Sequence, residues 1–469
     1  MSRVTVNATA TPHPLPQLQC GGPGRRSVVV IPEQPAHRRP PGPATPVALG
    51  IDPATLQTLE SACRTYGNIV AFTRPNGRLA YFVNEPAEIR RLLVRRHANT
   101  VKGPGFERVK MLLGNGLIVS DGEVWRRSRT MIQPAFSRAN VQRLIMLMVH
   151  CCEKRAKRWA AAAKAGEVLN ITRETSDFAL ELILRSIFGA DYDRFVLADG
   201  LNPFSFLSDD STRDLRVVLK VRELRSMVLG IIAERRRDSS TREYDFLGAY
   251  VAARDKAGKP FDDTELLDEL MTLVIAGYET SAGTLNWAWY LLARHPHLHE
   301  ALVAEAAELI PDPSEVNDTS VAGMHYAQAL LEETLRLYPP VWLFTRRATA
   351  DDVLGDFDLP AGTDIYLSPY VLHRSAEFWP DPGNVDPMRF DAVSIARKGE
   401  LPYFPFSLGP RRCLGEYFSF LEMKIHLGLL SQKFAMQLLE NAEPSLDLGI
   451  NLRSQSDIHL RPGFHSTPK

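Results

Sequence analysis

This sequence predicts a mainly helical fold with a small β-region, built as one large domain. The first observation is a long helical pattern that begins with a capping arrangement at Asp262–Glu265 and runs to Arg294. Its middle is apolar on nearly all sides, which indicates a buried central helix. The second observation is that helical periodicity returns at residues 141–165 and 177–188, whereas the β-like runs are short. A chain of 469 residues can bury a sizeable core in one catalytic unit.

The composition argues against several classes of protein. Lysine and arginine together number 55, as do aspartate and glutamate, so the formal net charge is zero and neither nucleic acid nor an anionic membrane is expected as the main partner. The N-terminal region has no apolar run long enough to cross a bilayer, so we expect no membrane anchor. The cysteines are few and scattered, which is typical of a soluble protein of the reducing cytoplasm; they are Cys20, Cys63, Cys151, Cys152 and Cys413.

The N-terminal residues differ in composition from the rest of the chain. Residues 1–45 are rich in proline, glycine and arginine and end in the run Arg-Arg-Pro-Pro-Gly-Pro at 38–43. Proline stiffens the chain and is incompatible with a helix interior. We therefore expect a flexible N-terminal extension over residues 1–45 and a single catalytic domain over residues 46–469.

Local signals place the smaller elements. The pair Asn76-Gly77 lies between two β-like runs at residues 69–73 and 79–83, which predicts a hairpin. A second hairpin is predicted at residues 357–367, and residues 102–116, with four glycines, are predicted to be mostly loop. Further helices are predicted at residues 53–66, 86–95, 223–237 and 327–337.

The stretch Phe406 to Gly415 reads Phe-Ser-Leu-Gly-Pro-Arg-Arg-Cys-Leu-Gly and precedes a helical run. Unpaired backbone N–H groups and the helix dipole at such a position lower the pKa of a cysteine and make Cys413 a candidate ligand or nucleophile. Gly409 and Gly415 let the backbone turn sharply and approach a flat, bulky group. For Cys413 taken alone, the alternative is a small buried apolar residue.

This stretch resembles the haem-binding loop of the cytochromes P450, Phe-x-x-Gly-x-Arg-x-Cys-x-Gly, at each of its five defining positions. The resemblance extends from about residue 40 to the C-terminus. It implies the cytochrome P450 fold, with haem b between the long central helix and the loop and with the Cys413 thiolate as axial ligand of the iron. The loop residues that it implies in cofactor binding are Phe406, Gly409, Arg411 and Gly415.

The middle of the central helix reads Ala276-Gly277-Tyr-Glu279-Thr280-Ser281. Packing alone explains it poorly, because glycine costs a helix about 1 kcal/mol against alanine and a buried carboxylate needs a partner. The alternative is a kinked structural helix. The segment resembles the family's oxygen-binding helix, in which the Thr280 hydroxyl bonds back to the Ala276 carbonyl and opens a groove beside the cofactor at Ala276 and Gly277. The resemblance implies that Thr280 steadies the bound peroxo group and that Glu279 relays protons.

Four further residues match family positions that bind the haem propionates. Trp125 and Arg129 form a Trp-x-x-x-Arg pattern, for which the alternative is an aromatic ring packed on an arginine stem. Arg346 follows an apolar run at the position of the family's second propionate-binding arginine. His373 is expected either to reach a propionate or to be an ordinary hydrogen-bonded histidine.

A charge network is predicted to hold the Cys413 loop. Glu333 and Arg336 are three residues apart on a predicted helix and resemble the family's Glu-x-x-Arg motif, to which Arg389 adds a third member. A structural role is the favoured interpretation. The alternative for the pair alone is a surface ion pair of little energetic weight.

The resemblance implies monooxygenation, by hydroxylation or epoxidation, of a hydrophobic small molecule with O2. We expect no appended electron-transfer domain, so electrons are expected from NAD(P)H through a separate ferredoxin or flavodoxin and its reductase. These would dock at Arg126, Arg127 and Arg412. We expect a monomeric bacterial enzyme of secondary metabolism. The expected substrate contacts are Phe106, Leu117, Val341, Leu343 and Phe344.

Other functions remain compatible with the motifs. A peroxide-driven haem–thiolate enzyme, an isomerase or a dehydratase would keep Cys413 but would not need Glu279 and Thr280. A haem-binding sensor without turnover is a different class, and the acid–alcohol pair argues against it. A cysteine hydrolase is the weakest alternative, because no histidine partner for Cys413 is evident.

Overall fold

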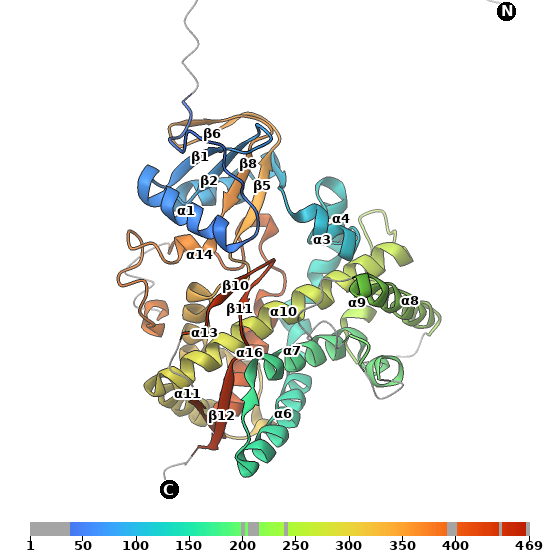
Figure 1. The fold of residues 1–469 in the computed structure, drawn as a ribbon. Helices are drawn as coiled ribbons and strands as arrows, with labels where there is room; N and C mark the ends of the chain where they lie inside the picture. Colours follow the sequence, from blue (N-terminus) through green and yellow to red (C-terminus); the bar gives the residue numbers. More distant parts are fainter. Residues whose placement is uncertain are drawn as a thin grey trace, which may run out of the picture. The chain divides into compact units, whose positions relative to one another are not determined.

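Helix α10 (Asp263–Arg294) is the longest described helix and crosses the middle of the computed structural model in Figure 1. The structure describes residues 38–197, 202–204, 215–238, 243–391, 401–439 and 443–465. At the start of α10, the Asp262 side chain accepts a hydrogen bond from the Glu265 N–H at 2.8 Å, and the Glu265 side chain accepts one from the Asp262 N–H at 2.9 Å. The capping arrangement predicted there is confirmed.

Helices on several sides cover α10 and explain why its sequence is apolar on nearly all sides. It packs against α7 (Ile171–Phe188), α13 (His325–Leu337) and α16 (Glu416–Ser431), while α6 (Ile145–Ala165) packs against α7 and α16. Trp287 and Trp289 of α10 are fully buried in the main core. The predicted buried central helix is confirmed.

The remaining helices surround this core. They are α1 (Pro53–Tyr66), α2 (Pro86–Arg90), α3 (Phe106–Leu113), α4 (Gly122–Ile132), α5 (Arg138–Gln142), α8 (Leu215–Arg237), α9 (Phe246–Ala252), α11 (Pro296–Leu309), α12 (Asp318–Gly323) and α14 (Pro369–Leu372), with short π- and 3₁₀-turns at Arg91–Arg95, Pro387–Phe390 and Gly409–Arg411. In the described part of the chain, no helix combines the length and the apolar character needed to span a bilayer.

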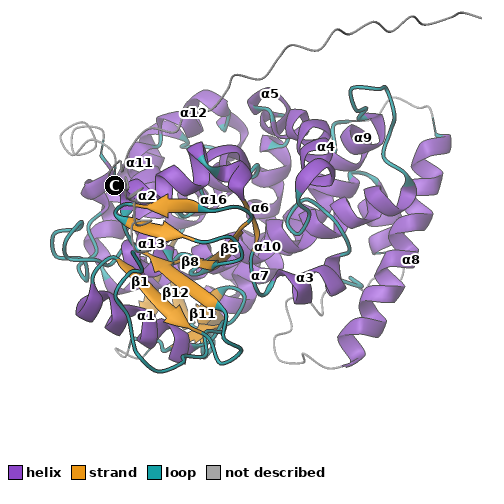
Figure 2. Ribbon diagram, turned by 90° about the horizontal axis from the view of Figure 1, so that it is seen from above, coloured by secondary structure: helices purple, strands orange, loops and turns teal. Residues whose placement is uncertain are grey.

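The largest sheet has the strand order β1-β2-β8-β5-β3, and Figure 2 shows its strands on the side of the described unit away from α8 and α9. Its strands are β1 (Ile69–Thr73), β2 (Leu79–Val83), β3 (Thr100–Lys102), β5 (Phe344–Ala348) and β8 (Asp364–Leu367). The predicted first hairpin is confirmed, since β1 pairs with β2 in the register Ile69 to Val83 and Thr73 to Leu79.

The second predicted hairpin is wrong. The segment before Gly362, β7 (Phe357–Leu359), pairs with β6 (Asp352–Leu354). The segment after it, β8, runs between β2 and β5 in the large sheet. The turn is real, with Gly362 at φ +83°, but it joins strands of two different sheets. The other strands form the pair β10 (Leu446–Leu448) and β11 (Leu452–Ser454), and the sheet β4 (Leu169–Asn170), β12 (His459–Phe464) and β9 (Phe434–Leu438).

The loop predicted at residues 102–116 contains helix α3. Gly105 precedes the helix with φ +100°, and Gly114 ends it with φ +76°. Two of the four glycines therefore flank a helix and mark its two ends. Counting glycines as loop residues gave the wrong prediction for this reason.

The N-terminal extension predicted for residues 1–45 falls largely on residues 1–37, which lie outside the described residues. The part from Arg38 onward is attached to strands. The Arg38 N–H donates to the Asp358 carboxylate at 2.8 Å, and the Pro41 carbonyl accepts from the Ala71 N–H at 2.9 Å. Residues 38–469 belong to one compact unit, so the chain joins this unit before residue 45.

Candidate active site

The Cys413 loop is shaped by its own backbone and by the elements beneath it. The Cys413 N–H donates to the Phe406 carbonyl at 2.9 Å and closes the loop, while the Phe406 ring packs 5.3 Å from that of Phe420 on α16. Gly409 has φ +68°, and a Cβ on it would lie 2.3 Å from the Leu93 carbonyl oxygen. Only glycine fits this position, because both the backbone conformation and the close approach exclude a side chain.

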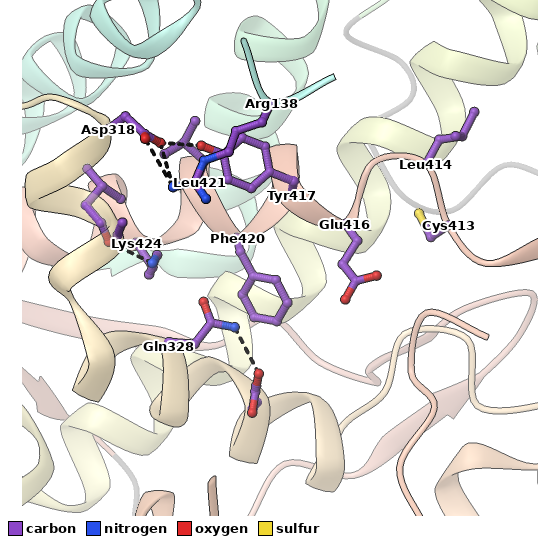
Figure 3. A pocket seen from close by; sticks show the side chains of 13 residues that line it. Arg138, Asp318, Gln328, Cys413, Leu414, Glu416, Tyr417, Phe420, Leu421 and Lys424 are labelled. Carbon is purple, nitrogen blue, oxygen red and sulfur yellow. Dashed lines mark hydrogen bonds and ion pairs between the residues drawn. The ribbon is translucent and has the colours of Figure 1, made fainter. Parts of the chain in front are cut away.

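The Cys413 side chain is exposed at the wall of a cavity of ≈ 500 Å³, shown in Figure 3. Desolvation by the surrounding protein raises the pKa of the thiol, and the backbone N–H groups of Gly415 and Glu416 and the Arg129 guanidinium lower it by less. The lowering predicted from the helix N-terminus is thus present but smaller than the effect of desolvation. None of the residues that line this cavity belongs to α10.

One face of α10 is partly exposed in the middle of an otherwise buried helix. Leu273, Gly277 and Thr280 are spaced four and three residues apart, and Ala276 adjoins Gly277; all four are half-buried, which marks open space along that face. The Thr280 hydroxyl donates to the Ala276 carbonyl at 2.9 Å, so the predicted back-bond is confirmed. A Cβ on Gly277 would lie 2.7 Å from Cγ1 of Ile183, so the packing of α7 on α10 is what requires glycine there.

Glu279 is held by a partner that the sequence did not reveal. The Arg453 guanidinium on β11 donates to Glu279 through Nε at 3.0 Å and through Nη2. The β10–β11 hairpin is itself fixed, because the Trp342 indole N–H donates to the Gly449 carbonyl at 2.9 Å and the Leu452 N–H donates to the Pro340 carbonyl at 2.8 Å. The carboxylate beside Thr280 is therefore anchored to the segment that precedes β5.

A cluster of cations lies where the resemblance places the propionates. Lys102 of β3 is directly opposite Arg346 of β5, and Arg411 of the Cys413 loop acts on both. Asp121 pairs with Arg411 at 2.5 Å. Burial, followed by repulsion from the neighbouring cations, lowers the pKa of Lys102 well below its usual value, and burial with repulsion from Arg411 lowers the pKa of Arg346 to about 10.

This cluster provides a test of whether haem fits the site. Like charges directly opposite each other on two strands are destabilising, and buried cations need anionic partners. Asp121 supplies one negative charge for the three cations Lys102, Arg346 and Arg411. A ligand with two carboxylates, as haem has, matches the remaining charge. Sequence reasoning missed Lys102, because only the strand register brings it to Arg346.

Trp125 and Arg129 of α4 both contact the Cys413 loop. The Arg411 guanidinium lies over the Trp125 ring, 4.4 Å from its centroid. Nη1 of Arg129 donates to the Arg412 carbonyl at 2.7 Å, and burial lowers the pKa of Arg129. The pair therefore also supports the loop that carries Cys413.

His373 is held in place by a backbone hydrogen bond. Its side chain is fully buried, and Nε2 accepts the Phe404 N–H at 3.1 Å. The Leu335 backbone lies near the ring and raises its pKa slightly, but Nδ1 has no hydrogen bond of normal geometry among the described residues. Burial, followed by the charges of Arg336 and Arg374, lowers the pKa of His373 well below its usual value, so the ring is neutral. The contact with a propionate stays a prediction.

Glu333 and Arg336 form a buried pair, not a surface one. Both side chains are 0 % exposed, and Arg336 donates to the two Glu333 oxygens at 2.7 and 2.8 Å. Arg336 also donates to the carbonyls of His373, Pro382 and Asn384 at 2.9, 2.9 and 3.1 Å. One guanidinium thus fixes the backbone on both sides of Trp379.

Arg389 joins this network from the 3₁₀-turn at Pro387–Phe390. Its Nε lies 3.5 Å from Glu333 Oε1, and its other nitrogens donate to the Pro380 and Asp381 carbonyls at 2.6 and 2.9 Å. The predicted three-member charge network is therefore present as geometry.

The expected substrate contacts lie in different surroundings. The Phe106 ring lies 4.9 Å from the Lys102 ammonium, and the Phe344 ring lies 5.2 Å from the Arg346 guanidinium, so both flank the cation cluster. The Leu117 N–H donates to Glu269 of α10 at 2.9 Å. The other two belong to the segment before β5: Val341 is half-buried and Leu343 is buried in the main core.

The three arginines expected to form the docking patch differ in how they are paired. Arg127 bonds to Asp255 at 2.8 Å, to Glu265 at 2.7 Å and to the Pro260 carbonyl at 2.9 Å, so it is a structural cation. Arg126 and Arg412 are more than half exposed. Arg126 pairs with Glu123 of α4, and Arg412 pairs with Glu416, the first residue of α16.

Comparisons with known proteins agree with this geometry. The family model described as Cytochrome P450 matches residues 48–458. Cyclooctatin synthase of Streptomyces melanosporofaciens is 30% identical over 79% of this chain and 83% of that protein. Pentalenene oxygenase of Streptomyces avermitilis is 28% identical over 82% of this chain and 87% of that protein, and human Cytochrome P450 4F8 is 28% identical over 87% and 85%. The chain belongs to the cytochrome P450 monooxygenase family.

Proposed function

We propose that this protein inserts one oxygen atom from O2 into an apolar small molecule, by hydroxylation or epoxidation, and that Cys413 is the thiolate ligand of its haem b. The observation that carries the proposal is the cation cluster of Lys102, Arg346 and Arg411 beside the Cys413 loop. It fits a group with two carboxylates. When bound, haem supplies the oxygen activation and the redox chemistry.

The side chains of the cation cluster and of the Glu333 network have different tasks. Arg346 and Lys102 hold the carboxylates of the cofactor, with Arg411 kept in place by Trp125 and Asp121. Glu333, Arg336 and Arg389 fix the segment that leads into the Cys413 loop.

Thr280 and Glu279 are the proposed proton-handling residues. The Thr280 hydroxyl donates a hydrogen bond to the Ala276 carbonyl, so its oxygen is left to accept a hydrogen bond from a donor on the open side of the helix. Glu279, paired with Arg453 and one residue away from Thr280, is the group that relays protons through water.

Electrons reach the protein, we propose, from NAD(P)H through a separate ferredoxin or flavodoxin and its reductase. The substrate class is carried over from relatives named for oxygenating pentalenene and cyclooctat-9-en-7-ol. The partly exposed apolar residues Leu273 and Ala276 on α10 are consistent with a small apolar substrate.

The test is the absorption difference spectrum of the reduced protein with carbon monoxide. A strongly red-shifted Soret band in wild type, lost in Cys413→Ser and kept in Cys63→Ser, is the expected result. Cys63 is a matched control because it is a half-buried free cysteine that lies outside the loop. A haem-loaded wild type without that band, or a Cys413→Ser variant that keeps it, would overturn the assignment of Cys413.

A further inference from the structure

Glu422 is a buried acid on α16, nine residues after Cys413. Its side chain is 0 % exposed, and Oε1 accepts a hydrogen bond from the hydroxyl of Ser281. Ser281 is itself buried and directly follows Thr280 in α10. One buried hydrogen bond therefore joins the helix that begins at the Cys413 loop to the turn of α10 that carries Thr280.

The surroundings of Glu422 favour its uncharged form. Burial raises the pKa of Glu422 to about 8, and the hydrogen bond from Ser281 lowers it by less. Its second oxygen, Oε2, has no hydrogen-bond partner among the described residues. A buried carboxylate without a cation is costly, so the group keeps its proton near neutral pH.

The titratable groups around Glu422 do not supply a compensating charge. Cys152 of α6 has a pKa raised well above its usual value by burial, and burial lowers the pKa of His426, one turn further along α16, to about 3. Both are neutral near pH 7. Arg155 of α6, whose charge also acts on Cys152 and His426, is paired with Glu174 at 2.8 Å.

We propose that Glu422 is a positioning residue that holds Ser281 and thereby sets where Thr280 lies relative to Cys413. This inference rests on the proposed function, which gives Thr280 and Cys413 their roles. A purely apolar side chain of similar volume would fill the space without the cost of burying a carboxyl group, but it would not tie α16 to Ser281. Loss of the proton leaves a buried charge, and relieving it requires α16 and α10 to shift apart or Glu422 to leave its position.

The experiment compares cofactor-loaded wild type with Glu422→Gln, Glu422→Ala and Ser281→Ala between about pH 6 and about pH 9. The readouts are the Soret maximum and spin state of the ferric protein and the midpoint of thermal unfolding. Glutamine is the neutral isostere and can still accept the Ser281 hydroxyl. Wild type is expected to change its spectrum with a midpoint near pH 8, whereas Glu422→Gln keeps the neutral-pH spectrum throughout.

The two truncations separate positioning from simple packing. Glu422→Ala and Ser281→Ala are expected to show the altered spectrum already at neutral pH, and the double variant is expected to go no further than either one. If Glu422→Ala does not fold, Ser281→Ala carries the same test, because it removes the other half of the bond. Glu269→Gln is the matched control: it neutralises another buried acid, with a pKa of about 7, and should leave the transition near pH 8 in place.

Two results would overturn the inference: a Glu422→Gln variant with the same alkaline transition as wild type, or truncations with the wild-type spectrum at all pH values. Failure of the proposed function looks different. A haem-loaded wild type without the red-shifted carbon monoxide band removes the thiolate assignment. A normal band together with identical pH profiles removes only the role of Glu422.

Discussion

Replacement of Glu333 by glutamine should remove several kcal/mol of stability, although it changes one atom. Glu333 and Arg336 are both 0 % exposed, and Glu333 also accepts the Asp386 N–H at 2.8 Å. Glutamine keeps the shape of the side chain, but its NH₂ group replaces one acceptor and faces the Arg336 guanidinium. The substitution also removes the negative charge, so Arg336 is left buried without a counter-charge. Breaking such a pair from one side costs about 3–5 kcal/mol.

The chain contains a matched control for this prediction. Glu123 and Arg126 have the same spacing on α4, but their side chains are 86 % and 59 % exposed. Glu123→Gln should therefore change the free energy of unfolding by no more than about 0.5 kcal/mol. Urea unfolding of the cofactor-loaded proteins, with the slope of the free energy against urea concentration fitted for each variant, measures the loss of stability in Glu333→Gln and in Glu123→Gln. A loss below about 1 kcal/mol for Glu333→Gln would refute the argument that Arg336 depends on this buried charge.

Three other substitutions test the loop, the central helix and the cation cluster. Gly409→Ala should lower the free energy of unfolding by about 3 kcal/mol in urea titrations, because its positive φ and the Leu93 carbonyl both oppose a Cβ. Gly277→Ala should lose about 1 kcal/mol in the same assay, since crowding against an isoleucine of α7 exceeds the gain in helix propensity. Lys102→Met should speed the transfer of haem to an acceptor protein about tenfold, while in the cofactor-free protein the loss of repulsion with Arg346 should raise the unfolding midpoint.

The parts of the fold that the sequence predicted well are those specified by neighbouring residues. The capping box at Asp262, the hairpin at Asn76-Gly77 and the back-bond of Thr280 each depend on a few adjacent positions. The hairpin predicted around Gly362 failed for the opposite reason. Its turn signal was correct, but β8 pairs in parallel with β2, far earlier in the chain, and no local signal shows that partner.

The same division holds for the site. The Cys413 loop was recognisable because its pattern is contiguous, whereas the partners that complete the site are remote in sequence. Glu279 and Arg453 are 174 positions apart, and Ser281 and Glu422 are 141 apart. Lys102 becomes a member of the cation cluster only through the register of β3 and β5. Sequence motifs therefore gave the Cys413 loop and the Glu333–Arg336 pair, but not the partners Arg453, Glu422 and Lys102.

Three consecutive residues of α10 show why the remote partners Arg453 and Glu422 matter. Thr280 shares the Ala276 carbonyl with the helix backbone, which weakens the helix locally and favours a bend. On either side of it, Glu279 is tied to β11 and Ser281 to α16. These two ties come from elements outside the helix and resist the distortion that Thr280 introduces. The position of the Thr280 hydroxyl is thus set jointly by Arg453 and Glu422. A chain that kept Glu279, Thr280 and Ser281 but lost both partners would no longer hold these three residues in place.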